Sequence, residues 1–176
     1  QADLVVFSGI KINKLDDLQQ ILQRKVVKTV IAAGGLALAL KAAQARHHGR
    51  EFGLGLAADS TQAKIHIPPE RIEQAATMYR QGLEAEVEFV LPADFILGDG
   101  SASRTIPDGE AQFDVGPETR AEQVEAVGRF LETHRTNVAA GHQPAIAFYN
   151  GVFGLFEEPA FETGTREFIG QLKRMT

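Results

Sequence analysis

Short apolar runs alternate with longer helix-forming runs through the first fifty residues of this chain, and glycine or polar residues stand at each junction. The apolar runs, rich in residues that favour strands, are 4–7 and 26–32, and the helix-forming runs are 15–22 and 36–43. Strands that alternate with helices usually pair in parallel, because a helical crossover returns the chain to the same end of the sheet. We therefore predict one α/β domain over residues 1–176, doubly wound, with a mainly parallel sheet and helices on both faces.

The middle of the chain continues this pattern with less regular spacing. A helix is predicted over residues 70–83, a strand of alternating polarity over 86–91, and a loop or hairpin over 101–113. Thr119 and Glu122 have the spacing of a capping box, which predicts the start of a further helix. The chain contains no internal repeat and no linker, so a single domain is expected.

A stretch near the C-terminus has the composition of a strand followed by a ligand-binding loop. Residues 145–149 are typical of a buried strand, which breaks at Asn150-Gly151. A helical segment is expected from Glu157, with Pro159 in its first turn. Such a loop can bind an anion, because backbone N–H groups and the helix dipole converge there. An ordinary turn that uses glycine for its geometry explains the same residues.

Charge and composition argue against several classes of partner. The formal net charge is −5 and no basic cluster is present, so we expect no nucleic-acid partner. No apolar run approaches the length of a membrane span, so we expect no membrane partner. The sequence contains no cysteine, which excludes disulfides and agrees with a cytoplasmic location.

Few ionisable side chains stand out as candidates for chemistry. The five histidines lack the spacing of a transition-metal site, and we predict no metal ligand among the site residues. Asp94, Asp99 and Asp114 lie next to predicted strands and either converge around Mg²⁺ or serve as turn residues. Lys11 and Lys14 lie in the first strand-to-helix loop, where they either contact a phosphate or remain solvated.

Several loops, taken in order, resemble one family. They read Ser8-Gly9-Ile10-Lys11-Ile12-Asn13-Lys14, Ala33-Gly34-Gly35-Leu36, Leu91-Pro92-Ala93-Asp94-Phe95, Ile106-Pro107-Asp108-Gly109, Asp114-Val115-Gly116-Pro117-Glu118-Thr119, Asn150-Gly151-Val152-Phe153-Gly154-Leu155-Phe156-Glu157 and Phe161-Glu162-Thr163-Gly164-Thr165. In order and approximate spacing, from about residue 4 to residue 172, they resemble the C-terminal, nucleotide-binding domain of phosphoglycerate kinase. The resemblance implies a Rossmann-like fold.

The resemblance also implies roles for ten residues. Lys11 and Lys14 would be catalytic, facing the transferring phosphoryl group and the nucleotide phosphates. Asn150 would lie beside the phosphates, and Glu157 would hold the ribose. The adenine pocket would be lined by Gly9, Gly34, Gly35, Gly151, Gly154 and Leu155. The implied cofactor is ATP or ADP with Mg²⁺, and the family's metal-facing aspartate would follow Thr176.

The reaction implied by the resemblance needs more than this chain. In the family, ATP and 3-phosphoglycerate exchange a phosphoryl group with ADP and 1,3-bisphosphoglycerate, in glycolysis or carbon fixation, when two domains close. Residues 1–176 correspond to most of one domain. We therefore expect the N-terminal substrate domain and the last part of the C-terminal domain to be absent, and the partner to be that missing domain or another protein chain.

Departures from the family pattern support an alternative. Tyr149 and Val152 stand where the family has tryptophan and proline, Ala32 and Ala33 stand where it has glycines, and one residue is missing between the two loop lysines. A methyl group reduces close approach where a ligand packs against bare backbone. The alternative is a degenerate, catalytically inactive module that serves as a structural or protein-interaction domain of a larger protein.

Overall fold

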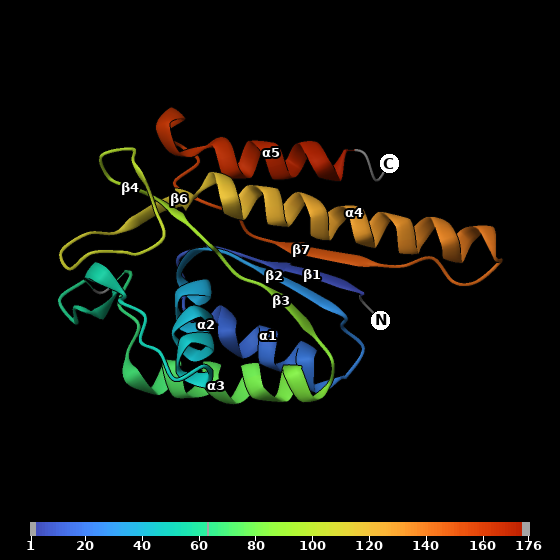
Figure 1. Cartoon of the computed structure of the whole chain (residues 1–176), viewed down its shortest axis with the longest axis horizontal. Coiled ribbons are helices and arrows are strands. Elements are labelled where there is room, and N and C mark those ends of the chain that lie inside the picture. The colour runs from blue at the N-terminus through green and yellow to red at the C-terminus, as the bar shows by residue number, and fades with distance from the viewer. Residues whose placement is uncertain (1–2, 63, 174–176) are drawn as a thin grey trace.

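A four-stranded parallel sheet forms the centre of the protein, whose computed structural model describes residues 3–62 and 64–173 (Figure 1). Its strands are β1 (Leu4–Phe7), β2 (Thr29–Ala32), β3 (Glu88–Val90) and β7 (Ala147–Asn150), in the order β3-β2-β1-β7. Phe7 of β1 lies opposite Ala32 on one side and Asn150 on the other. The predicted parallel sheet is confirmed.

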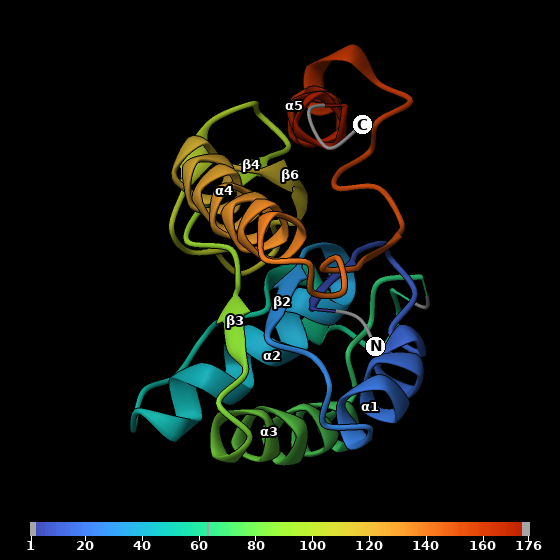
Figure 2. The same ribbon diagram turned by 90° about the vertical axis from the view of Figure 1, so that its right-hand side faces the viewer.

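Helices cover both faces of this sheet, as Figures 1 and 2 show. One face carries α1 (Lys14–Gln23), α2 (Gly34–His47) and α3 (Pro69–Glu84), and the other carries α4 (Pro117–Ala139) and α5 (Thr163–Leu172). Two short 3-10 turns are η1 (Gly55–Ala58) and η2 (Pro159–Phe161). The doubly wound α/β fold is therefore confirmed. Within the described part of the chain, no helix combines the length and the apolarity that crossing a membrane requires.

The central strand β1 is buried on both faces because its side chains alternate between two hydrophobic cores. Val5 and Phe7 belong to the core beneath α1, α2 and α3, whereas Leu4 and Val6 belong to the core beneath α4 and α5. None of the four is more than 1% exposed. A strand covered on both faces has a continuous apolar sequence, and residues 4–7 have this pattern.

A small antiparallel sheet stands beside the main one, where the sequence predicted a loop or hairpin. Its strands are β4 (Phe95–Leu97), β5 (Ala102–Ser103) and β6 (Gln112–Val115), in the order β5-β4-β6. The ring of Phe113 in β6 stacks on Phe161 of η2, with centroids 4.9 Å apart. This contact joins the small sheet to the segment that follows β7.

Three local predictions are wrong. β7 is an edge strand rather than a buried one, and Phe148 is 41% exposed because β1 alone pairs with β7 among the described strands. The N-cap of α4 is Gly116, so Thr119 lies inside the first turn and does not form the predicted capping box. No helix starts at Glu157, since η2 and then α5 begin further along the chain.

Candidate functional site

The loops after β1 and β7 diverge at the carboxyl end of the main sheet. These strands are neighbours, but α1 after β1 packs on one face and α5 after β7 packs on the other. Such a switch point opens a crevice, which is the usual ligand site of an open α/β sheet. A cavity of about 490 Å³ lies between these loops, and we call it the switch-point cavity.

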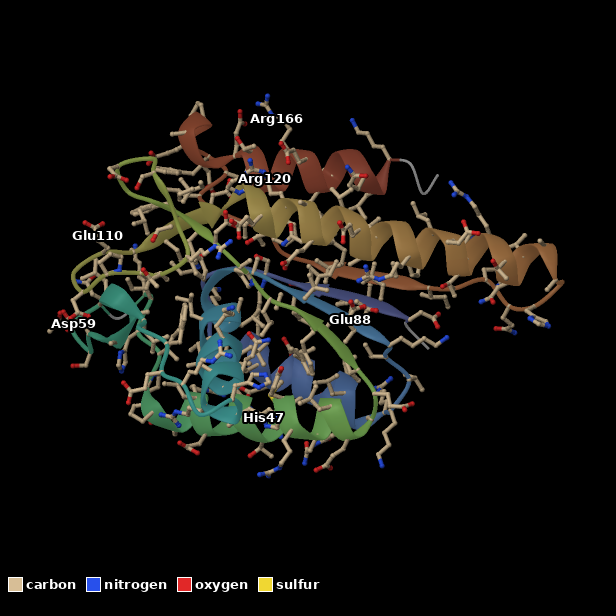
Figure 3. The ribbon with its side chains drawn as sticks, in the orientation of Figure 1. His47, Asp59, Glu88, Glu110, Arg120 and Arg166 are labelled. Carbon is tan, nitrogen blue, oxygen red and sulfur yellow. The ribbon has the colours of Figure 1, made fainter. Side chains whose placement is uncertain are left out.

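Five segments that are separate in the sequence line the switch-point cavity. They are the loop after β1, the start of α2, the region of η1, strand β6 with the residue before it, and the loop after β7. In Figure 3 the label of Asp59 shows where η1 lies, and the label of Glu110 shows where β6 begins. The N–H of Leu56 donates to the carbonyl oxygen of Glu110 at 2.7 Å, which holds these two segments together.

The lining of the cavity is mostly apolar. The apolar side chains are Ile10, Leu38, Leu54, Leu56, Ala57, Ile65, Ala111, Phe113, Val115, Val152, Phe153 and Leu155, and the polar ones are Gln62, Gln112 and Glu157. A concave apolar site with a few polar groups is typical of small-molecule and cofactor sites. The cavity is therefore suited to a flat, largely apolar group with a polar extension.

Close backbone packing explains the glycines at the start of α2. The N–H of Gly35 donates to the carbonyl oxygen of Gly9 at 2.8 Å. A Cβ atom at Gly35 would lie 2.7 Å from the carbonyl oxygen of Ile10. Gly9 and Gly34 have φ of 121° and 69°, a region in which side chains are unfavourable. Bare backbone thus faces the cavity, and the same glycines also let the two loops meet.

The structure brings six of the ten predicted site residues to the switch-point cavity. They are Gly9, Gly34, Gly35, Gly154, Leu155 and Glu157. The other four, Lys11, Lys14, Asn150 and Gly151, are not part of its lining. Two of these four, Lys14 and Asn150, share a hydrogen bond, and Gly151 lies next to them.

Lys14 bridges the loops after β1 and β7. Its Nζ donates to the carbonyl oxygen of Ser8 at 2.5 Å and to Oδ1 of Asn150 at 2.9 Å. A Cβ atom at Gly151 would lie 2.9 Å from the same Nζ, so glycine leaves room for the ammonium group. Lys14 therefore holds the two loops together at the edge of the cavity.

Positive charge is concentrated in the loop after β1. Burial lowers the pKa of Lys14, Asp17 opposes this effect, and the nearby charge of Lys11 adds to it. The side chain of Lys11 is exposed and has no hydrogen-bond or ion-pair partner among the described residues. An anion placed beside these two lysines would favour the charged form of both.

The helix N-terminus at the cavity belongs to α2 and not to the segment after β7. η2 has only three residues, and α5 carries an acidic residue, Glu162, at its N-cap. By contrast, Gly34 and Gly35 in the first turn of α2 line the cavity, and no side chain caps this turn. The loop after β7 is therefore not followed directly by the predicted helix from Glu157, and anion binding at this loop stays a prediction, while Glu157 itself lines the cavity.

Four departures from the family pattern support the alternative of a degenerate, inactive module, and these four residues lie in different environments. Ala32 and Ala33 are fully buried, one in each hydrophobic core, and neither lines the cavity. Their methyl groups therefore pack in the hydrophobic cores and not in the cavity. Tyr149 packs against the core beneath α4 and α5. Val152 alone among the four lines the cavity.

The candidate metal-binding aspartates are occupied by backbone N–H groups. Asp94 accepts hydrogen bonds from the first turn of α4 at 2.8 and 3.1 Å, Asp114 accepts one from Gly164 at 2.8 Å, and Asp99 accepts one from Ser101 at 2.9 Å. No group of three His, Asp or Glu side chains that could hold a metal ion occurs in residues 3–62 and 64–173. Asp99 therefore acts as a turn residue, as one of the two interpretations predicts, whereas Asp94 and Asp114 join segments that are 24 to 50 residues apart.

Sequence reasoning missed the apolar residues of the cavity other than Leu155. Leu54, Leu56 and Ile65 come from an irregular segment that has no periodicity, and Leu38 lies in the continuous apolar run of residues 36–40, which does not indicate a cavity-facing side. The alternation of Gly53 and Gly55 with leucines was the one local signal for a loop with apolar side chains directed inward. That signal does not say which cavity the loop would enclose.

The fold and this cavity define an α/β domain with a ligand site at its switch point. The family model of phosphoglycerate kinase matches residues 2–176. The chain therefore belongs to the phosphoglycerate kinase family, and the resemblance found in the sequence is confirmed.

Individual relatives are similar over almost the whole chain. A phosphoglycerate kinase of Desulfosudis oleivorans is 30% identical over 173 residues, covering 93% of this chain and 36% of the relative. One of Streptomyces griseus is 27% identical over 168 residues, covering 92% of this chain and 36% of the relative. The chain thus spans little more than a third of the length of these curated relatives.

Solved structures of phosphoglycerate kinases share the fold. The structure from Coxiella burnetii has a TM-score of 0.71 and 25% sequence identity, and the match covers 99% of this chain and 40% of that chain. The structure from Pyrococcus horikoshii has a TM-score of 0.70 at 18% sequence identity, and the match covers 98% of this chain and 39% of that chain. At this identity the match shows a shared fold only.

Proposed function

We propose that the switch-point cavity binds an adenine nucleotide, ADP or ATP. The observation that carries this proposal is a mostly apolar cavity at the switch point with bare glycine backbone on one side. An adenine ring needs flat apolar surfaces on both faces, and Leu38 and Leu155 are among the side chains that would supply them. Membership of the phosphoglycerate kinase family supports the same ligand.

The polar part of the nucleotide would extend toward the bridged loops. Lys11 and Lys14 would face the phosphates, with Asn150 beside them, and Glu157 at the cavity would hold the ribose hydroxyls. Lys14 would then exchange its present acceptors for phosphate oxygens. Mg²⁺ would enter with the nucleotide, because phosphate oxygens are ligands that this ion prefers.

The wider activity belongs to the same proposal. We infer that the chain contributes the nucleotide domain of a kinase that transfers a phosphoryl group between 1,3-bisphosphoglycerate and ADP. The substrate domain would come from a segment or chain outside residues 1–176, since the curated relatives are almost three times as long as the matched region. The cytoplasmic location expected from the cysteine-free composition remains a prediction.

Calorimetric titration of the purified chain with Mg·ADP and with Mg·ATP tests the proposal. Saturable binding is expected. Its absence at millimolar nucleotide in a folded sample would overturn the proposal and favour the non-catalytic structural or interaction module.

Two variants assign the polar contacts. Glu157→Ala should weaken the binding of ADP by roughly tenfold with an unchanged melting temperature, because an exposed side chain that contacts the ribose is lost. Glu158→Ala, at the exposed neighbouring position outside the cavity lining, is the matched control and should bind ADP normally.

Lys11→Ala should weaken the binding of ATP more than the binding of adenosine. Equal losses of affinity for the two ligands would show that Lys11 does not face phosphate.

A further inference from the structure

A second cavity lies at the opposite end of α2 from the nucleotide cavity. Its volume is about 390 Å³, and its lining shares no residue with that of the switch-point cavity. Figure 3 marks this end of α2 by His47, near α3. We call it the α2 C-terminal cavity.

The end of α2 explains how this cavity forms. Gly49 has φ of 67°, its N–H donates to the carbonyl oxygen of Arg46 at 3.0 Å, and the N–H of Arg50 donates to that of Ala45 at 2.8 Å. This is the hydrogen-bond pattern of a Schellman motif, in which glycine reverses the chain. Residues 50–52 consequently turn back past the helix, and the cavity lies between them and α2.

Basic side chains dominate the charged lining. Lys41, His48 and Arg50 contribute to it, against one acidic residue, Glu51. None of these three basic groups has a hydrogen-bond acceptor or ion-pair partner among the described residues. By contrast Arg46, on the same helix, pairs with Glu73. The cavity therefore has basic side chains that make no hydrogen bond or ion pair with a described residue, on a chain whose overall charge is negative.

Lys41 is the least exposed of these three basic residues. It is half-buried, and its Nζ lies 5.9 Å from the centroid of the Phe52 ring. Burial lowers the pKa of its ammonium group, and the charge of Glu122 on α4 only partly opposes this. A cation removed from water is stabilised by an aromatic face and by a counter-ion, and Lys41 has the ring of Phe52 and the charge of Glu122 but no ion pair within 4.0 Å among the described residues.

The opposing charges are limited. Glu51 lies at the same cavity and is exposed, so its field is screened by water. The helix C-terminus would repel an anion through its free carbonyl groups, but those of Gln44, Ala45 and Arg46 accept N–H groups of His48, Gly49 and Arg50. Glu122 acts on Lys41 from α4 but is not part of the lining, where Lys41 and Arg50 face the single carboxylate of Glu51, and this lining favours a negatively charged ligand.

We propose that the α2 C-terminal cavity binds a small organic phosphate monoester. Its dianionic phosphoryl group would pair with Lys41 and Arg50, where the planar guanidinium can donate two hydrogen bonds. Its carbon part would lie against Phe52 and Ala45. This site is separate from the nucleotide cavity and does not depend on the function proposed there.

Titration of the purified chain with phenyl phosphate, followed by calorimetry and by NMR, tests the proposal. Saturable binding is expected for phenyl phosphate and not for benzyl alcohol, which has a similar apolar ring and no charge. Lys41→Met and Arg50→Gln should each raise the Kd for phenyl phosphate by roughly tenfold. Both variants should leave titration with Mg·ADP unchanged.

Two matched controls distinguish binding at this cavity from a general effect of positive charge and from binding at the switch-point cavity. Arg80→Gln removes an exposed arginine on α3 that has no partner among the described residues and lies outside the cavity, so it should bind phenyl phosphate normally. Lys11→Ala should also bind it normally. Arg50 is exposed, so its variant keeps the test valid even if Lys41→Met unfolds. The proposal is overturned if phenyl phosphate does not bind, or if Arg80→Gln weakens its binding as much as Lys41→Met and Arg50→Gln do. It is also overturned if Lys11→Ala is the only variant that weakens this binding.

Discussion

Single residues at the switch-point cavity are constrained by contacts within the protein itself. Gly35 meets the loop after β1, where its N–H binds Gly9 and its missing side chain leaves room for Ile10. Lys14 is similarly occupied by Ser8 and by Asn150. Glycine and lysine at these positions therefore contribute to the packing of the loops seen in this structure. Their presence in the sequence supports a nucleotide site less directly than the cavity does.

Gly35→Ala should destabilise the protein by about 1–3 kcal/mol, because the new Cβ would lie 2.7 Å from a backbone oxygen that cannot move freely. Gly128→Ala is the matched control, since it lies within a helix with open space around its Cβ position. It should stabilise the protein by about 0.5–1 kcal/mol, because alanine favours a helix more than glycine does. Urea denaturation measures both. Similar effects of the two variants would contradict the packing role of Gly35.

At the scale of the elements, α4 is the longest helix described, and its cap comes from a distant part of the chain. The carboxylate of Asp94, just before β4, accepts the N–H groups of Glu118 and Thr119 at 3.1 and 2.8 Å. In return, the N–H groups of Ala93 and Asp94 donate to Oγ1 of Thr119, each at 3.0 Å. The N-cap itself is Gly116, whose position has no room for a Cβ beside this carboxylate. Asp94 thus joins the small sheet to α4.

Asp94→Ala should lower the free energy of unfolding by about 2 kcal/mol, because buried N–H groups at the helix start lose their acceptor. Asp108→Ala, in an exposed turn, should change it by less than about 0.5 kcal/mol. Chemical denaturation followed by far-UV circular dichroism measures both. If Asp94→Ala were as stable as Asp108→Ala, the capping role would be wrong.

At the scale of the whole molecule, β1 couples the two hydrophobic cores. Its four residues contribute alternately to the core on each face, so neither core is complete without this strand. The chain has two tyrosines and no tryptophan. Tyr79 lies in the core beneath α1, α2 and α3, and Tyr149 packs against the core on the other face. Each tyrosine therefore reports on one side of the sheet.

We expect both sides to unfold in one cooperative transition, because a domain of this size with shared central strands normally behaves as one unit. In Tyr79→Phe the remaining fluorescence reports on Tyr149, and in Tyr149→Phe it reports on Tyr79. Within each variant, the urea midpoint from fluorescence should equal the midpoint from circular dichroism. A difference between the two midpoints in either variant would show that the two cores unfold separately.

The fold class followed from local sequence patterns. The continuous apolar run of residues 4–7 indicates a strand buried on both faces, and the helix-forming run after Gly34 and Gly35 indicates a crossover. The order of the loops was enough to indicate the phosphoglycerate kinase family. These features depend on neighbours in the sequence, and so the amino-acid sequence by itself determined them.

The tertiary structure alone decided how the site is assembled. It placed Glu157 at the cavity although no helix starts there, directed the methyl groups of Ala32 and Ala33 into the cores, and gave Lys14 its partners across two loops. It also closed the cavity with apolar residues from η1 and β6. Contacts between segments so far apart depend on how the helices and both sheets pack, and no local pattern of residues encodes that packing.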